Sequence, residues 1–175
     1  MKKALIITTG LSLLFTISCK ENSKNVNYSN DEQKTELQIK KIADISFSNT
    51  MTSRVFQDYQ QLRRSLIASD SDGAKIAAQN LADGLSEDQK HMKLNALAMA
   101  EANELEKQRE LFSDFSNKVE SMFRESISAG SIYKQFCPMA FEGEGGYWIS
   151  NVEEIKNPYY GNKMLKCGTA VEIIQ

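Results

Sequence analysis

The chain has 175 residues, of which 41% are hydrophobic and 25% charged; 21 basic and 23 acidic side chains leave a net charge of −2. This balance excludes nucleic acid as a partner, because a nucleic-acid-binding protein needs a basic surface for the phosphates. The length suits one domain with its own core rather than two. No grouping of nucleophile, base and orienting side chain is visible, so we do not expect an enzyme.

Residues 1–18 have the pattern of a secretory signal peptide. Two lysines precede an apolar run over 4–17, which is too short to span a membrane and ends just before Cys19. A cysteine at the cleavage point is typical of a bacterial lipoprotein signal, although Thr16 stands where such signals usually carry leucine. We therefore expect Cys19 to be lipidated and the protein to be anchored in the bacterial cell envelope, facing the periplasm or the cell surface. The alternative is an ordinary signal peptide with an incidental cysteine.

Residues 19–34 are polar and predict a flexible tether, because they have too little apolar surface to offset the entropy cost of ordering. Residues 35–130 then predict a helical bundle. Apolar residues recur there at spacings of three and four, which is the pattern of one buried helix face. The four stretches run over 55–66, 74–85, 91–99 and 112–122. Short connections favour antiparallel neighbours, so we expect an up-down bundle of about four helices.

Several residues mark where these helices should begin and end. The cluster 69–72 should end the first helix, and Ser86 should cap the third. Asn103 with Glu106 has the spacing of a capping pair and should open the fourth helix, which Gly130 should close.

Residues 131–175 change character and predict a small, irregular, β-rich cap packed on the bundle. Three glycines over 143–146 allow tight turns, and the stretches 147–149 and 171–174 have the composition of short strands. The fold class expected for the whole chain is therefore mainly α, with a β-rich C-terminal cap that forms one domain with the bundle.

The cap also contains the most specific chemical signal in the chain. Cys137 and Met139 are two residues apart, so both would face one side of an extended strand. Met164 and Cys167 are three apart and would share one side of a helical turn. Two such pairs facing each other would form a four-sulfur site, and sulfur ligands suit Cu(I). His91, the single histidine, is a candidate additional ligand.

Each of these residues also has a structural interpretation. In an oxidising compartment, Cys137 and Cys167 can form a disulfide that closes a loop of about thirty residues. Met139 and Met164 can pack against Trp148 and the tyrosines, since methionine fills irregular cores. His91 can lie half-buried on its helix, facing the cap or solvent. The residues alone leave these alternatives open.

A set of short strings lies between Val55 and Glu172: SLIASD (65–70), HM (91–92), QRE (108–110), FCPMA (136–140), GYW (146–148), EIKNPYYG (154–161) and MLKCG (164–168). In these strings the chain resembles a bacterial family of unknown function that occurs in small envelope lipoproteins and is also appended to periplasmic adaptors of heavy-metal (copper/silver) efflux systems. The resemblance implies copper or silver handling, with Cys137, Met139, Met164, Cys167 and His91 as ligands. It also implies that Gln108 and Arg109 hold the cap by hydrogen bonds.

We expect a lipid-anchored envelope protein that binds a soft metal ion, Cu(I) or Ag(I), and exchanges it with a heavy-metal efflux or copper-transfer protein. The alternative is a non-catalytic interaction domain with a structural Cys137–Cys167 disulfide. Its aromatic cap would then meet a partner protein through Tyr147, Trp148, Tyr159 and Tyr160.

Overall fold

The computed structural model describes residues 44–175, so the expected signal peptide, Cys19 and the tether lie outside the described residues. Four α-helices occur in this described part: α2 (Thr50–Ala68), α3 (Ser71–Gly84), α4 (Lys90–Glu101) and α5 (Leu105–Ser126). Its strands are β1 (Ser46–Phe47), β2 (Ile127–Ala129), β3 (Ile132–Cys137), β4 (Gly146–Ser150) and β5 (Thr169–Ile174). Short 3-10 turns lie at Glu87–Gln89 (η1), Phe141–Gly143 (η2) and Gly161–Lys163 (η3). The predicted fold class is confirmed: mainly α with a β-rich C-terminal cap.

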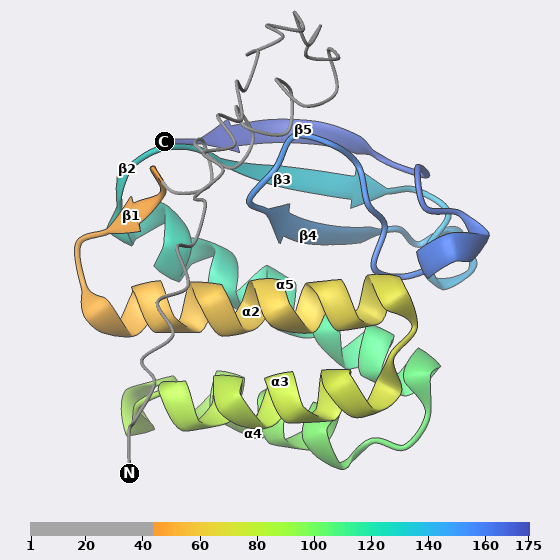
Figure 1. Ribbon diagram of the computed structural model, residues 1–175, viewed down its shortest axis with the longest axis horizontal. Helices are drawn as coiled ribbons and strands as arrows, with labels where there is room; N and C mark the ends of the chain where they lie inside the picture. The colour runs from red at the N-terminus through yellow and green to blue at the C-terminus, as the bar shows by residue number, and fades with distance from the viewer. Residues whose placement is uncertain (1–43) are drawn as a thin grey trace, which may run out of the picture.

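The helices form an up-down bundle with the larger sheet on one side. Helices α3 and α4 lie together on the side of α2 and α5 that faces away from the sheet (Figure 1). The sheet therefore lies against α2 and α5, and α5 packs directly on β4. Anything attached to α4 is separated from the sheet by a layer of helices.

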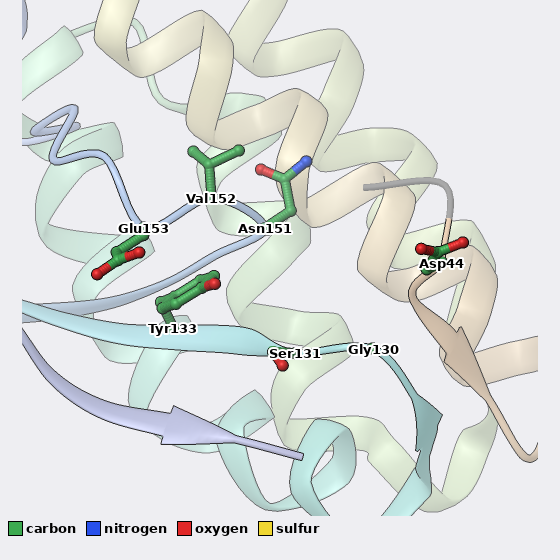
Figure 2. A pocket seen from close by; sticks show the side chains of 7 residues that line it. All are labelled: Asp44, Gly130, Ser131, Tyr133, Asn151, Val152 and Glu153. Atoms are coloured by element: carbon green, nitrogen blue, oxygen red, sulfur yellow. The ribbon is translucent and has the colours of Figure 1, made fainter. Parts of the chain in front are cut away.

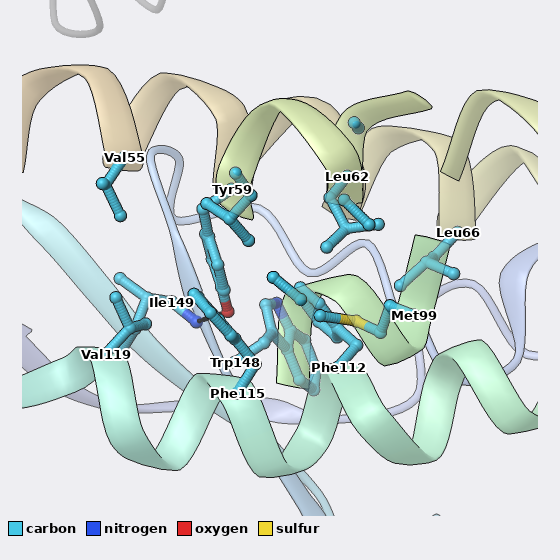
Figure 3. Packing of buried hydrophobic residues seen from close by; sticks show 14 of the residues in the cluster. Val55, Tyr59, Leu62, Leu66, Met99, Phe112, Phe115, Val119, Trp148 and Ile149 are labelled. Carbon is cyan, nitrogen blue, oxygen red and sulfur yellow. Dashed lines mark hydrogen bonds between the residues drawn. The ribbon is translucent and has the colours of Figure 1, made fainter. Parts of the chain in front are cut away.

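One hydrophobic core joins the bundle to the cap. The ring of Tyr59 on α2 stacks on Phe112 and Phe115 of α5, with ring centroids 5.0 and 6.2 Å apart. Trp148 and Ile149 of β4 are almost completely buried and enter the same cluster (Figure 3). Because aromatic side chains bury large apolar areas, removing the cap would expose much of the bundle's core.

One predicted helix boundary, at 69–72, is confirmed in detail, and a second is met only by the turn that precedes its helix. Ser69 adopts a left-handed conformation after α2, and the Asp70 carboxylate accepts a hydrogen bond from the Gly73 backbone N–H at 2.9 Å, which caps α3. Ser86 and Gln89 form a capping box at η1, the 3-10 turn directly before α4, whereas α4 itself begins after Gln89 without a side-chain cap.

Two other boundary predictions are wrong. Helix α5 begins after Glu104 without a side-chain cap, and the Asn103 side chain instead accepts a hydrogen bond from Lys75 at 2.8 Å. The helix ends at Ser126, and Gly130 occupies the turn between β2 and β3 with φ +80°. A β-carbon at Gly130 would lie 2.9 Å from the Asp44 carbonyl oxygen, so the glycine is needed for this close approach rather than for a helix end.

The larger sheet has the order β4-β3-β5 with antiparallel neighbours, while β1 and β2 form a separate pair. The predicted strands over 147–149 and 171–174 correspond to β4 and β5. The central strand β3 was not predicted as a strand. Lys134 on one of its faces forms an ion pair with Glu120 of α5 at 2.7 Å. The opposite face, with Gln135 and Cys137, is covered by the long connection between β4 and β5 (Figure 1). We call this connection, residues 151–168, the covering segment.

Candidate functional site

The structure brings the two cysteines of the cap together. Cys137 is the last residue of β3, Cys167 lies near the end of the covering segment, and their sulfur atoms are 3.2 Å apart. Both are free thiols. Cys137 is fully buried within the core and Cys167 is partly exposed. The pair therefore forms a dithiol with one inner and one outer sulfur.

The residue after the outer cysteine explains how the covering segment comes so close to β3. Gly168 has φ +134°, and a β-carbon there would lie 2.7 Å from the Phe136 carbonyl oxygen and 3.0 Å from the Trp148 ring. A side chain at this position would push Cys167 away from Cys137. The glycine after Cys167 therefore allows the two thiols to lie close together.

The two methionines lie beside the pair at the surface. Met139 does not share a face with Cys137, because β3 ends at Cys137 and the chain turns; its side chain is 53% exposed, whereas Cys137 is buried. The Met139 backbone N–H nevertheless donates to the Cys167 sulfur. Met164 is 38% exposed, and its carbonyl oxygen accepts a hydrogen bond from the Cys167 backbone N–H at 3.0 Å. The backbones of Met139 and Met164 thus both lie beside Cys167.

The proximity of the thiols changes the acidity of the outer one. The hydrogen bond shared with Cys137 raises the pKa of the Cys167 thiol, and burial and the neighbouring sulfur act in the same direction. The Met139 backbone N–H opposes this effect, since a hydrogen bond to a thiolate stabilises it. At neutral pH the Cys167 thiol is therefore protonated until a ligand or an oxidant displaces its proton.

His91 is not part of this group of residues. It lies exposed at the beginning of α4, in the helix layer that faces away from the sheet (Figure 1). The structure thus brings together Cys137, Cys167 and the backbones of Met139 and Met164, but not His91. Within residues 44–175, no group of three or more histidine, cysteine or acidic side chains is arranged to hold a metal ion.

Arg109 fastens the covering segment to the helices, as the resemblance implied. Its buried guanidinium donates from Nε to the Pro158 carbonyl oxygen at 3.0 Å and from Nη2 to the Leu66 carbonyl oxygen at 3.3 Å. Gln108 does not contact the covering segment through these bonds. Its side-chain amide donates to the carbonyl oxygens of Ser71 and Ala102 within the bundle.

The aromatic residues of the cap divide between core and surface. Trp148 and Tyr159 are buried, with their rings 5.8 Å apart in an edge-on contact. Tyr147 is 37% exposed and Tyr160 is partly exposed. Only the last two of the four aromatic residues are therefore accessible to a partner protein.

A small cavity lies elsewhere, between the β2–β3 turn and the beginning of the covering segment. Its volume is about 200 Å³, and Figure 2 shows Tyr133, Asn151 and Glu153 among its lining residues. It contains no sulfur ligand, and its two carboxylates, on Asp44 and Glu153, are not accompanied by a basic side chain.

Comparison with known proteins gives a partial match to one family model and no function. A family model described as "Protein of unknown function (DUF3347)" matches residues 55–129, which correspond to the four helices and β2. This match is consistent with a domain of unknown function. No curated protein and no solved structure matches the chain. The cysteine pair lies outside the matched range.

No helix among residues 44–175 is long and apolar enough to cross a membrane.

Asn157 is a site residue that the sequence reasoning missed. It is fully buried, and its side chain donates to the Cys167 carbonyl oxygen at 2.8 Å. An Asn-Pro dipeptide is typical of a turn and by itself predicts no contact with a distant residue. The ten-residue separation from Cys167 gives no periodic signal by which the contact could have been found.

Proposed function

We propose that this protein is a lipid-anchored envelope protein that binds a soft monovalent metal ion, Cu(I) or Ag(I), through Cys137 and Cys167. The observation that carries the proposal is the pair of free sulfurs 3.2 Å apart, with Met139 and Met164 beside the outer one. Thiolate and thioether sulfur are soft ligands that suit Cu(I), and the thioether in particular distinguishes such a site from a zinc site.

The separation of the sulfurs is compatible with a shared ion. Two sulfurs bound to one ion at about 2.3 Å and a tetrahedral or wider angle are roughly 3.8 Å apart or more. The covering segment would thus have to move outward by at least about 0.6 Å to accept an ion. Binding would displace the thiol protons, so affinity should rise with pH.

Exposure supports an exchange of the ion rather than its permanent storage. The inner thiol is sealed in the core, while Cys167, Met139 and Met164 face outward. An incoming donor would reach the outer sulfurs first, and the ion would pass between them and a heavy-metal efflux or copper-transfer protein by ligand exchange. The lipid on Cys19 would keep the protein at the membrane where such partners work.

Native mass spectrometry of the chain carrying Cys19→Ser tests the metal site. It is run on oxidised and reduced protein, with and without Cu(I) under a competing chelator. We expect one copper ion on the reduced form and none on the oxidised form, and loss of the adduct in Cys137→Ser and Cys167→Ser.

Two further variants test the thioethers. Met139→Leu and Met164→Leu keep the side-chain volume and remove the sulfur ligand, and each should weaken Cu(I) binding by roughly tenfold. Met92→Leu on α4 is the matched control and should bind as the wild type does. Reduced protein without a copper adduct would refute the proposal.

A structural disulfide in a non-catalytic interaction domain is the second candidate, and it is favoured by the complete burial of Cys137. Such a bond would fasten the covering segment to β3 and stabilise the fold by about 3–4 kcal/mol in the chain-entropy model. Here a reducing agent would lower stability and copper would change nothing. Tyr147 and Tyr160 would then be the accessible aromatic residues for a partner.

A further inference from the structure

Cys167 lies in an irregular part of the covering segment, between η3 and β5. Neither a helix nor a sheet ladder therefore fixes the place of its sulfur. The separation of 3.2 Å from Cys137 must depend on other contacts of the covering segment. Hydrogen bonds of one buried residue, Asn157, are among these contacts.

Asn157 ties both ends of the loop 157–167 together. Its side-chain nitrogen donates to the Cys167 carbonyl oxygen at 2.8 Å, and its backbone N–H donates to the Leu165 carbonyl oxygen at 2.8 Å. Its side-chain oxygen accepts from the backbone N–H groups of Tyr159 at 2.8 Å and Tyr160 at 3.3 Å. The residue has no exposed surface, so none of these bonds competes with bulk water.

The helices hold this loop in turn. Arg109 of α5 donates to the carbonyl oxygen of Pro158, the neighbour of Asn157, and also to the end of α2 at Leu66 and Ser69. Gly161 packs against the same place, because a β-carbon there would lie 2.7 Å from the Ile67 carbonyl oxygen. A continuous series of contacts thus runs from the rigid helices through Asn157 to Cys167.

We propose that Asn157 is a positioning residue that holds the Cys167 sulfur within reach of Cys137, with Arg109 anchoring it to the bundle. The inference deepens the proposed metal-binding function and rests on it for its biological meaning. The positioning itself also acts on disulfide formation, which requires no metal. Fixed outer contacts keep ligands in place, and their loss typically weakens metal binding by about 10–100-fold.

The first test measures how readily the two thiols pair. The full chain with Cys19→Ser, in which Cys137 and Cys167 are the only thiols, is equilibrated with glutathione. One glutathione disulfide accepts two electrons and two protons from the pair, giving the protein disulfide and two glutathione thiols. Asn157→Asp keeps the acceptors for Tyr159 and Tyr160 but removes the donor to Cys167. We expect the equilibrium constant for the protein disulfide to fall by about tenfold, because the effective concentration of the thiols falls.

Asn117→Asp is the matched control, since it makes the same change at an exposed position of α5. If Asn157 were merely structural, Asn157→Asp would lower the unfolding midpoint and leave the equilibrium constant of the folded protein equal to that of the control. That result would overturn the inference.

The Cu(I) affinity of the same variants, measured against a competing chelator, tests this inference separately from the proposed function. We expect Asn157→Asp to weaken binding by about 10–100-fold relative to Asn117→Asp. A wild type without Cu(I) affinity would refute the proposed function, while the glutathione equilibrium would still decide the role of Asn157. Equal Cu(I) affinity in both variants, with a wild type that binds, would contradict the positioning role.

Hydrogen exchange provides a further check that requires no substitution at Asn157. It compares the oxidised and the reduced form of the chain with Cys19→Ser. Joining the sulfurs should stabilise the loop that positions them, because coupling between the two is reciprocal. We therefore expect oxidation to slow exchange of the Asn157, Tyr159 and Cys167 backbone N–H groups and to leave α3 unchanged. Unchanged exchange over 157–167 would count against the inference.

Discussion

At the scale of single residues, the Tyr59 hydroxyl is a central polar link of the core. It bonds to the Ser116 hydroxyl at 2.7 Å and accepts a hydrogen bond from the Ile149 backbone N–H at 3.0 Å, so it connects α2, α5 and β4. Burial raises its pKa to about 12, since the phenolate cannot be solvated there. This neutral hydroxyl is thus one of several links between the bundle and the cap.

Tyr59→Phe should lower the free energy of unfolding by about 1–3 kcal/mol, because it leaves the Ile149 N–H buried without a partner. Urea denaturation monitored by circular dichroism measures the change. Tyr147→Phe is the control, since Tyr147 is 37% exposed, and it should change stability little. A Tyr59→Phe variant as stable as this control would contradict the assignment.

The same variant tests the pH dependence. The pKa of Tyr59 is raised by folding, so its contribution to stability is complete below the unfolded-state pKa near 10 and is lost as pH rises toward about 12. The wild type should therefore lose stability over this interval more steeply than Tyr59→Phe does.

At the scale of secondary-structure elements, the connection between α2 and α3 depends on two adjacent polar residues. Ser69 takes a left-handed conformation with φ 57°, and Asp70 caps α3 through the Gly73 N–H. The Ser69 hydroxyl also accepts a hydrogen bond from Arg109 at 3.2 Å, so this helix junction supports the anchor of the covering segment as well.

Asp70→Ala should cost about 1 kcal/mol of stability through loss of the helix cap. Thermal and urea unfolding measure it. Asp72→Ala removes an exposed acidic residue from the first turn of the same helix without removing the cap, and should cost only a few tenths of a kcal/mol. Equal effects of the two changes would show that helix-dipole electrostatics, rather than capping, stabilises this end.

At the scale of the whole molecule, the bundle is the support on which the cap presents its two thiols. Cys137 belongs to the common core, and Cys167 reaches it through a segment that Arg109 fastens to the helices. Because the cap is anchored at both the core and the covering segment, a loss of bundle stability should loosen the thiol pair before the protein unfolds globally.

The proposed membrane anchor is tested on the whole chain in a bacterial host. With Cys19 intact, we expect the protein in the membrane fraction and released only by detergent, since a diacylated anchor holds it firmly. Cys19→Ser should move most of it to the soluble fraction. A soluble wild-type protein would instead indicate an ordinary signal peptide.

Much of the helical part could be predicted from the sequence, because a helix with one buried face requires apolar residues at regular local spacings. The stripe with Val55, Tyr59, Leu62 and Leu66 is buried on α2 as its spacing predicted. The end of α2 at the cluster 69–72 and the capping role of Ser86 before α4 were also found, since such signals involve residues only a few positions apart. The pair Asn103 and Glu106 satisfied the same local rule and failed, because Asn103 bonds to Lys75 of another helix instead.

The sequence by itself determined the mainly α class, the four helical stretches and the presence of a sulfur-rich cap. Only the tertiary structure decided that Cys137 meets Cys167, that Met139 and Met164 stay at the surface beside them, and that His91 lies on another layer. Periodicity reports which face of an element is buried but not which distant element covers it. The thiol contact spans thirty residues and depends on buried bonds from Asn157 and Arg109, so it is fixed by the packed fold and not by any local pattern.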